Sequence, residues 1–159
     1  MGQTISFLCH HCGYEERISM GVGMFWDLDK IFQGIVNDVK KGKYGEPWKN
    51  ELHNNPSLVV NISDELYVCP SCGYFCTGLN LSLYNQTDKI PLQFHHRKAY
   101  GTDLTLDLSS DYQLYKKYPH ACKMCGEYLH IYNYQQDVPT PCCPKCGSNG
   151  EMKMDILWD

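Results

Sequence analysis

The sequence predicts an α+β fold dominated by β structure, and three observations lead to this class. One stretch of the 159-residue chain carries apolar residues at helical spacing, whereas several others alternate apolar and polar residues as strands do. Four copies of a Cys-x-x-Cys-Gly unit are spread along the chain. The apolar fraction of 43% and the charged fraction of 20% are those of a chain that folds around a core.

The helical pattern lies within residues 28–39, where apolar side chains recur at the i, i+3, i+4 and i+7 positions of one helix face. Asp27 can cap the start of this helix, and Gly42 can end it. Pro47 suits the first turn of a second, short helix. We therefore expect a helical insertion over about residues 24–55. The predicted apolar stripe consists of Leu28, Ile31, Phe32, Ile35, Val36 and Val39.

The remaining segments before the third cysteine unit show the alternation of half-buried strands. Residues 4–8 and 14–19 are predicted to pair antiparallel, and residues 58–62 and 65–68 to form two further strands. Residues 79–117 contain no cysteine and alternate leucines with polar residues, which predicts a β meander.

Eight of the ten cysteines fall in the repeated units, and this regular pairing indicates metal binding rather than disulfides. Residues 1–8 have no basic region and no long apolar run, so we expect no secretory signal and a cytoplasmic location. The predicted metal ligands are Cys9, Cys12, Cys69, Cys72, Cys122, Cys125, Cys143 and Cys146.

The spacing suits zinc because two intervening residues let a tight turn aim both sulfur atoms at one point. The glycine after each second cysteine can take the positive φ that such a turn commonly needs. Pro70 and Pro144 set φ just after the first cysteine of their units. Two units supply four sulfurs, the closed tetrahedral set of a structural zinc site, so we expect two Zn²⁺ ions. Iron also accepts four sulfurs, but no redox partner is indicated.

The Cys-Pro-x-Cys-Gly units resemble the rubredoxin-type knuckles of the zinc-ribbon superfamily. The whole chain also resembles small, uncharacterised bacterial proteins with two zinc ribbons, in which the second ribbon ends in a strand such as residues 156–159. This resemblance implies metal binding and a ribbon fold. It implies no particular activity, because ribbons serve many roles.

The spacing favours pairing of successive units. Seventeen residues separate Cys125 from Cys143, which fits one four-cysteine site flanked by strands at residues 127–134 and 151–158. Cys9 and Cys12 would then join Cys69 and Cys72 across 56 residues. The alternative, in which the outer units join and the inner units join, stays open.

Sequential pairing leads to a division into three successive segments. Residues 1–78 would form the first ribbon with its helical insertion, residues 79–117 the linking meander, and residues 118–159 the second ribbon. The two cysteines outside the units, Cys76 and Cys142, are expected to be small free thiols.

The charge balance disfavours nucleic-acid binding over the whole surface. The net charge is −4, and two zinc–tetrathiolate centres would bring it near −8. Nucleic-acid affinity depends heavily on Lys and Arg at phosphates. Basic residues nevertheless lie beside aromatic ones in three clusters, so nucleic-acid binding remains the alternative function. The clusters are Lys40, Lys41, Lys43 and Lys49 near Tyr44 and Trp48; His95, His96, Arg97, Lys98 and Tyr100; and Tyr115, Lys116, Lys117 and Tyr118.

The motifs indicate no enzyme. The chain has no Ser/His/Asp arrangement, no His-Glu-x-x-His and no phosphate loop, and no apolar run approaches the ~18 residues of a membrane helix. Twelve tyrosines and three tryptophans are many for this length, and both residue types are favoured at interfaces. The leading expectation is a structural zinc protein that acts as an adaptor or regulator through protein contacts.

Overall fold

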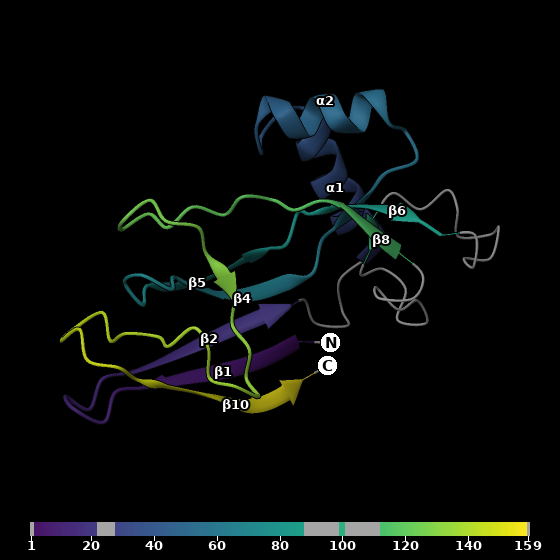
Figure 1. Cartoon of the computed structure of the whole chain (residues 1–159). Helices are drawn as coiled ribbons and strands as arrows, with labels where there is room; N and C mark the ends of the chain where they lie inside the picture. The colour runs from purple at the N-terminus through teal and green to yellow at the C-terminus, as the bar shows by residue number, and fades with distance from the viewer. Residues whose placement is uncertain (1, 22–27, 88–98, 101–111, 159) are drawn as a thin grey trace. The chain divides into compact units, whose positions relative to one another are not determined.

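The computed structural model describes residues 2–21, 28–87, 99–100 and 112–158 (Figure 1). The leucine alternation at residues 104–108, expected as a strand of the meander, lies outside these ranges. None of the described helices is long and apolar enough to cross a membrane.

The chain divides into two compact units, each assembled from separated segments. Unit 1 consists of Met1–Met24, Asp64–Gly78 and Pro119–Asp159. Unit 2 consists of Phe25–Ser63 and Leu79–Tyr118. This division differs from the three successive segments expected from the sequence, because unit 1 gathers both ends of the chain with a piece of its middle.

Unit 1 contains a three-stranded antiparallel sheet whose central strand is β1 (Gly2–Leu8). The neighbouring strands are β2 (Glu15–Gly21) and β10 (Glu151–Trp158), and the order is β10-β1-β2 (Figure 1). The hairpin β1–β2 matches the predicted antiparallel pair. Strand β10 also lies where it was expected, but it pairs with β1 at the other end of the sequence.

A second sheet of three strands has β4 (Asp64–Val68) at its centre. Strands β5 (Phe75–Leu79) and β9 (His130–Ile131) flank it. The predicted strand at residues 127–134 is thus reduced to two residues, of which Ile131 lies opposite Tyr67 and His130 opposite Val68.

The core of unit 1 forms between these two sheets. Ile5 and Phe7 are fully buried, as the alternation along β1 predicts. The ring of Phe7 lies 4.8 Å from that of Phe75. Gly150 lets the chain approach the same ring, since a Cβ there would come within 2.2 Å of it. The buried cluster contains Ile5, Phe7, Cys9, Met20, Leu66, Val68, Tyr132, Cys143 and Met152.

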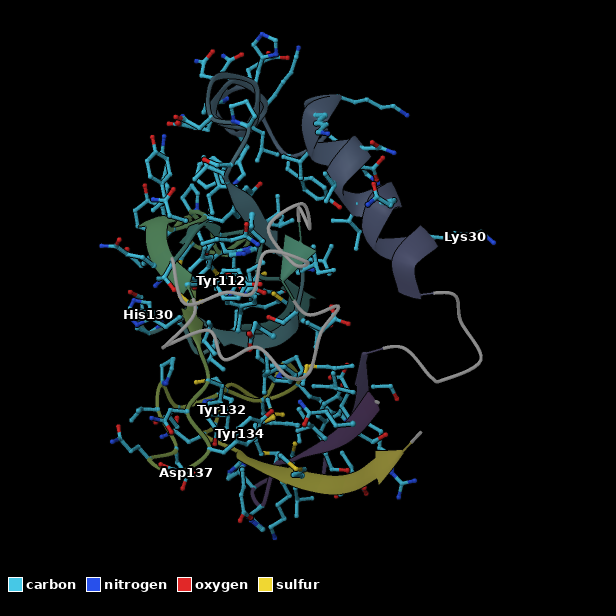
Figure 2. The ribbon with its side chains drawn as sticks, turned by 90° about the vertical axis from the view of Figure 1, so that its right-hand side faces the viewer. Lys30, Tyr112, His130, Tyr132, Tyr134 and Asp137 are labelled. Atoms are coloured by element: carbon cyan, nitrogen blue, oxygen red, sulfur yellow. The ribbon has the colours of Figure 1, made fainter. Side chains whose placement is uncertain are left out.

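The loop after β9 is fixed by aromatic side chains of unit 1 (Figure 2). The backbone N–H of Tyr132 donates to the carbonyl of Leu66 at 2.8 Å, and its hydroxyl donates to Asp137 Oδ1 at 2.8 Å. The ring of Tyr134 meets that of Tyr132 edge-on at 4.9 Å. These contacts tie the segment leading to Cys143 onto β4.

Unit 2 combines two helices with a four-stranded sheet. The helices are α1 (Leu28–Lys40) and α2 (Glu46–Asn54), which match the predicted helical insertion. The sheet order is β7-β3-β6-β8, in which β3 pairs antiparallel with β6 and parallel with β7, and β6 pairs antiparallel with β8. These strands are β3 (Val59–Asn61), β6 (Leu83–Gln86), β7 (Ala99–Tyr100) and β8 (Tyr112–Lys116).

The predicted meander is interrupted at its start. Residues 80–82 lie between β5 and β6 rather than in a strand, and Leu81 has a positive φ of 61°. Asn80 and Ser82 are nevertheless buried, so the leucine alternation does not separate a core face from a solvent face here. The Asn80 side chain accepts the N–H of Ser82, a local bond that competes with strand pairing.

The core of unit 2 forms where both helices meet residues from the sheet. Val36 and Val39 are buried, which confirms the predicted stripe over the part of α1 whose side chains are described. From α2, Trp48 donates its Nε1–H to the carbonyl of Leu81 at 2.7 Å. The cluster contains Val36, Val39, Trp48, Leu52, Leu58, Val60, Ile62, Leu81 and Leu83.

We expect Trp48→Phe to destabilise unit 2 by about 1–3 kcal/mol, because it leaves the carbonyl of Leu81 without its donor in a buried position. Chemical denaturation of the purified chain measures the change. Leu114→Ala is the control, since Leu114 is 52% exposed and its loss should cost less than about 0.5 kcal/mol. Equal effects of the two substitutions would contradict the role given to this hydrogen bond.

Candidate metal centres

The four Cys-x-x-Cys-Gly units share one backbone conformation, here called a knuckle. In each, the carbonyl of the first cysteine accepts the glycine N–H at 2.8–2.9 Å, and its N–H donates to the carbonyl five residues further on at 2.7–2.8 Å. Each glycine has a φ between 68° and 80°, as predicted. The knuckles are residues 9–13, 69–73, 122–126 and 143–147.

The knuckle turns also point backbone N–H groups at sulfur. The N–H of Met124 donates to Cys122 Sγ at 3.4 Å, and the N–H of Lys145 donates to Cys143 Sγ at 3.4 Å. A hydrogen bond donated to a thiolate favours its charged form. The turns therefore prepare the cysteines for binding a cation.

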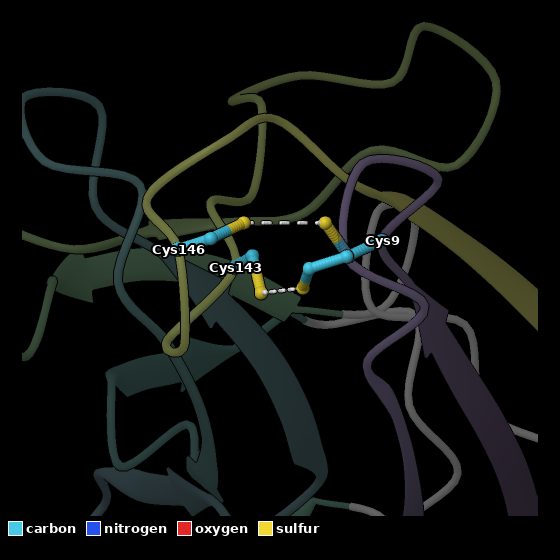
Figure 3. A group of neighbouring side chains, drawn as sticks. Cys9, Cys143 and Cys146 are labelled. Carbon is cyan, nitrogen blue, oxygen red and sulfur yellow. Dashed lines mark hydrogen bonds between the residues drawn. The ribbon is translucent and has the colours of Figure 1, made fainter.

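The eight sulfurs form two groups of four, and within each group all sulfurs lie within 4.8 Å of one another. In the first group, Cys9 Sγ lies 3.6 Å from Cys146 Sγ and Cys12 Sγ lies 3.6 Å from Cys143 Sγ (Figure 3). We call Cys9, Cys12, Cys143 and Cys146 the outer site, because they enclose the others along the chain.

The second group repeats this arrangement. Cys69 Sγ lies 3.5 Å from Cys125 Sγ, and Cys72 Sγ lies 3.6 Å from Cys122 Sγ. These four residues are called the inner site. Disulfide sulfurs lie about 2.05 Å apart, whereas four sulfurs placed tetrahedrally at about 2.3 Å from Zn²⁺ lie about 3.8 Å from one another. The sulfur distances in both sites therefore fit metal coordination and exclude disulfides.

The expected sequential pairing is wrong, and the alternative left open by the sequence is the one observed. Strand pairing sets the outcome. Because β1 pairs antiparallel with β10, Leu8 lies opposite Glu151, and the knuckle that follows β1 meets the knuckle that precedes β10. In the second sheet, Val68 lies opposite His130 in the same way, so the knuckle after β4 meets the knuckle before β9.

The two sites place their cysteines in the same way relative to solvent. The first cysteine of every knuckle is buried, and the second is exposed. Cys9 and Cys143 belong to the larger core cluster of unit 1. Cys69 and Cys122 form a smaller cluster with Tyr67 and Leu129. A bound ion would thus be anchored in the core on one side and capped by solvent-facing sulfurs on the other.

The four thiols of a site cannot all lose their protons easily without a cation. The backbone N–H and the side chain of Ser148 lower the pKa of Cys146 to about 5. The backbone N–H of Tyr14 lowers the pKa of Cys12, but partial desolvation and the neighbouring thiols outweigh it and raise this pKa to about 12. Similar causes raise the pKa of Cys72 in the inner site to about 12. Without a metal ion, only some of the four thiols in a site are therefore deprotonated. A divalent cation stabilises all four as thiolates.

Cys76 and Cys142 belong to neither site, as expected. Burial raises the pKa of both thiols, so they stay protonated at neutral pH. In the described part of the chain, only the outer and inner sites bring three or more His, Cys, Asp or Glu ligand atoms together.

A contact between Gly73 and Cys142 joins the two sites, and sequence reasoning missed it. Gly73 closes an inner-site knuckle, and its carbonyl accepts the N–H of Cys142 at 2.8 Å. Cys142 directly precedes the outer-site ligand Cys143. A Cβ at position 73 would lie 2.2 Å from Cys142 Sγ, so only glycine fits. The glycine was predicted from its turn, and nothing in the sequence marks its second role.

A second missed residue is Glu151, at the start of β10. Its Oε2 lies 3.0 Å from Nε2 of His10, which belongs to the first knuckle. The contact with His10 lowers the pKa of the Glu151 carboxyl, with a further contribution from Lys153. The pair holds the tip of one outer-site knuckle against the strand that leaves the other.

Comparisons with protein-family models, with curated proteins and with solved structures give no match. The two four-cysteine groups are therefore the feature on which a function can be assigned to this chain.

Proposed function

We propose that the chain is a structural zinc protein in which one Zn²⁺ in the outer site and one in the inner site stabilise unit 1. We further propose that it catalyses no reaction and acts as an adaptor or regulator through contact with another protein. The closed set of four sulfurs in each site carries this proposal. Catalytic zinc keeps a position open for water or substrate, and four cysteine ligands leave none.

The small size of the sheets in unit 1 supports a structural role for the metal. Strand β9 has two residues, and each sheet has three strands. Such small assemblies commonly need a metal or disulfides to be stable. Because each ion would join knuckles more than 40 residues apart in the sequence, zinc stabilisation on the order of 10 kcal/mol per site is coupled to folding.

We expect the purified chain to hold two zinc ions, measured by elemental analysis against protein concentration. A strong chelator should abolish the protection of backbone amides against hydrogen exchange in unit 1 and leave helix α1 of unit 2 protected. The reason is that the unit 2 core contains none of the eight ligands. Iron absorption bands, or full amide protection of unit 1 without metal, would contradict the zinc role.

The adaptor role is supported by large apolar side chains at the surface of unit 1. Met124 is 69% exposed, Tyr128 is 61% exposed and Ile131 is 41% exposed. All three belong to the third knuckle or the strand segment after it. Aromatic side chains and methionine are enriched in protein interfaces.

Affinity capture from the native host, with nuclease present, tests this role. We expect one specific protein to be retained and to be lost with the double change Met124→Ser and Tyr128→Ser. Leu114→Ser is the matched control, because Leu114 is a similarly exposed apolar residue of unit 2. Capture that depends on intact nucleic acid, and that weakens with salt, would favour the nucleic-acid alternative instead.

A further inference from the structure

A groove in unit 2 lies where the end of α1 meets α2. It has a volume of about 490 Å³ and is lined by Lys40, Lys49, Asn50, Leu52 and His53. This volume lies within the range of about 300–1,000 Å³ found for ligand pockets. The described residues of the lining include no carboxylate, and four of these five side chains can donate hydrogen bonds.

We propose that this groove binds an acidic peptide segment of a protein partner, with one apolar side chain on Leu52 and carboxylates on the surrounding lysines. The proposal rests on the adaptor role above and names the chemistry of a partner. It does not depend on the metal sites, whose cysteines all belong to unit 1.

The positive charges of Lys40 and Lys49 are accessible to the carboxylates of a partner. Among the described residues, the side chain of Lys40 has no hydrogen-bond or ion-pair partner. Lys49 Nζ lies 3.1 Å from both carboxylate oxygens of Glu46, but both side chains are well exposed, at 41% and 66%. Exposed pairs of this kind contribute little, so a partner carboxylate can compete for Lys49.

Leu52 supplies the apolar part of the groove. It is 8% exposed and belongs to the core cluster of unit 2, so its position is fixed by packing. Asn50 and His53 lie on the same helix and add polar groups beside it. An apolar floor with donors around it fits an apolar residue flanked by acidic ones.

The surroundings favour a short peptide over nucleic acid. Acidic residues lie on the same two helices, namely Asp38, Glu46 and Glu51. A nucleic acid carries a phosphate at every nucleotide and would extend beyond a groove of this size, whereas a peptide can confine its charge to the groove.

The test measures binding of a labelled peptide, one leucine flanked by glutamates, to the full zinc-loaded chain by fluorescence anisotropy. We expect Lys40→Glu to weaken binding at least tenfold. Lys117→Glu changes the net charge equally, at an exposed lysine of unit 2 that does not line the groove, and should leave binding within twofold. A peptide with glutamine in place of glutamate, or alanine in place of leucine, should bind at least tenfold more weakly.

Three results would overturn the groove assignment. The first is that the acidic peptide shows no saturable binding. The second is that Lys40→Glu and Lys117→Glu weaken peptide binding equally. The third is that single-stranded nucleic acid displaces the peptide, binds more tightly than the peptide and requires Lys40. Zinc content and capture through the third knuckle are read in separate measurements, so failure of the groove and failure of the proposed function are distinguishable. Unchanged melting of both variants shows that the binding change is local.

Discussion

Cys9→Ser and Cys146→Ser should each remove the same metal ion, although 136 residues lie between the two positions. Both sulfurs belong to the outer site, where they lie 3.6 Å apart. Each variant should retain one zinc ion per chain, held by the inner site. The apparent loss is on the order of 10 kcal/mol of metal-coupled folding free energy, which is the largest effect expected for any single substitution in this chain.

Double substitutions test the pairing directly. Cys9→Ser with Cys146→Ser should bind as much metal as either single variant, whereas Cys9→Ser with Cys69→Ser should bind none, because it damages both sites. Zinc content and the absorption of Co²⁺-substituted protein give the count. If Cys9 and Cys69 instead behaved as members of one site, the sequential pairing would be restored and the observed pairing of β1 with β10 would be wrong.

Gly73→Ala should destabilise unit 1 by about 2–5 kcal/mol. Part of this cost comes from the φ of 68°, which alanine adopts at a penalty of about 1–2 kcal/mol. The rest comes from overlap, because the new Cβ would lie 2.2 Å from Cys142 Sγ and 2.8 Å from the backbone N of Cys142. Relief of this overlap requires backbone movement, and overpacking of this kind costs about 1–3 kcal/mol.

Gly126→Ala is the matched control for this substitution. Gly126 occupies the same place in its knuckle, with a φ of 80°, but a Cβ there meets nothing within 4 Å. It should therefore show the conformational penalty alone. Chemical denaturation of the zinc-loaded proteins measures the difference, and metal affinity should fall at both sites in Gly73→Ala only. Identical stability of the two variants would show that the contact with Cys142 carries no energy.

Local features of this fold could be read from the sequence because they depend on neighbouring residues. Helix α1 follows from its apolar spacing, and α2 follows from Pro47 in its first turn. The knuckle turns follow from Cys-x-x-Cys-Gly, whose glycine needs a positive φ. These features required no knowledge of which segments meet.

The pairing of knuckles could not be read in the same way, because it depends on strands far apart in the sequence. The spacing between Cys125 and Cys143 suits a shared site, but the loop between them, fixed through Tyr132 and Leu66, carries Cys143 to the other group. A strand such as β10 has no local signal that selects β1 as its neighbour. The division of unit 1 into three segments follows from that choice.

The pairing of β1 with β10 also has a consequence for the order in which the chain can fold during synthesis. Strand β1 and the thiols of Cys9 and Cys12 leave the ribosome before their partners at residues 143–158, which come at least 130 residues later. The inner site has both its knuckles by residue 126 and can close earlier. Until β10 is made, the first knuckle is an open dithiol, accessible to oxidants and to other metals. The outer site can therefore be completed only after Cys146 has been made, whereas the inner site needs only the chain up to Cys125.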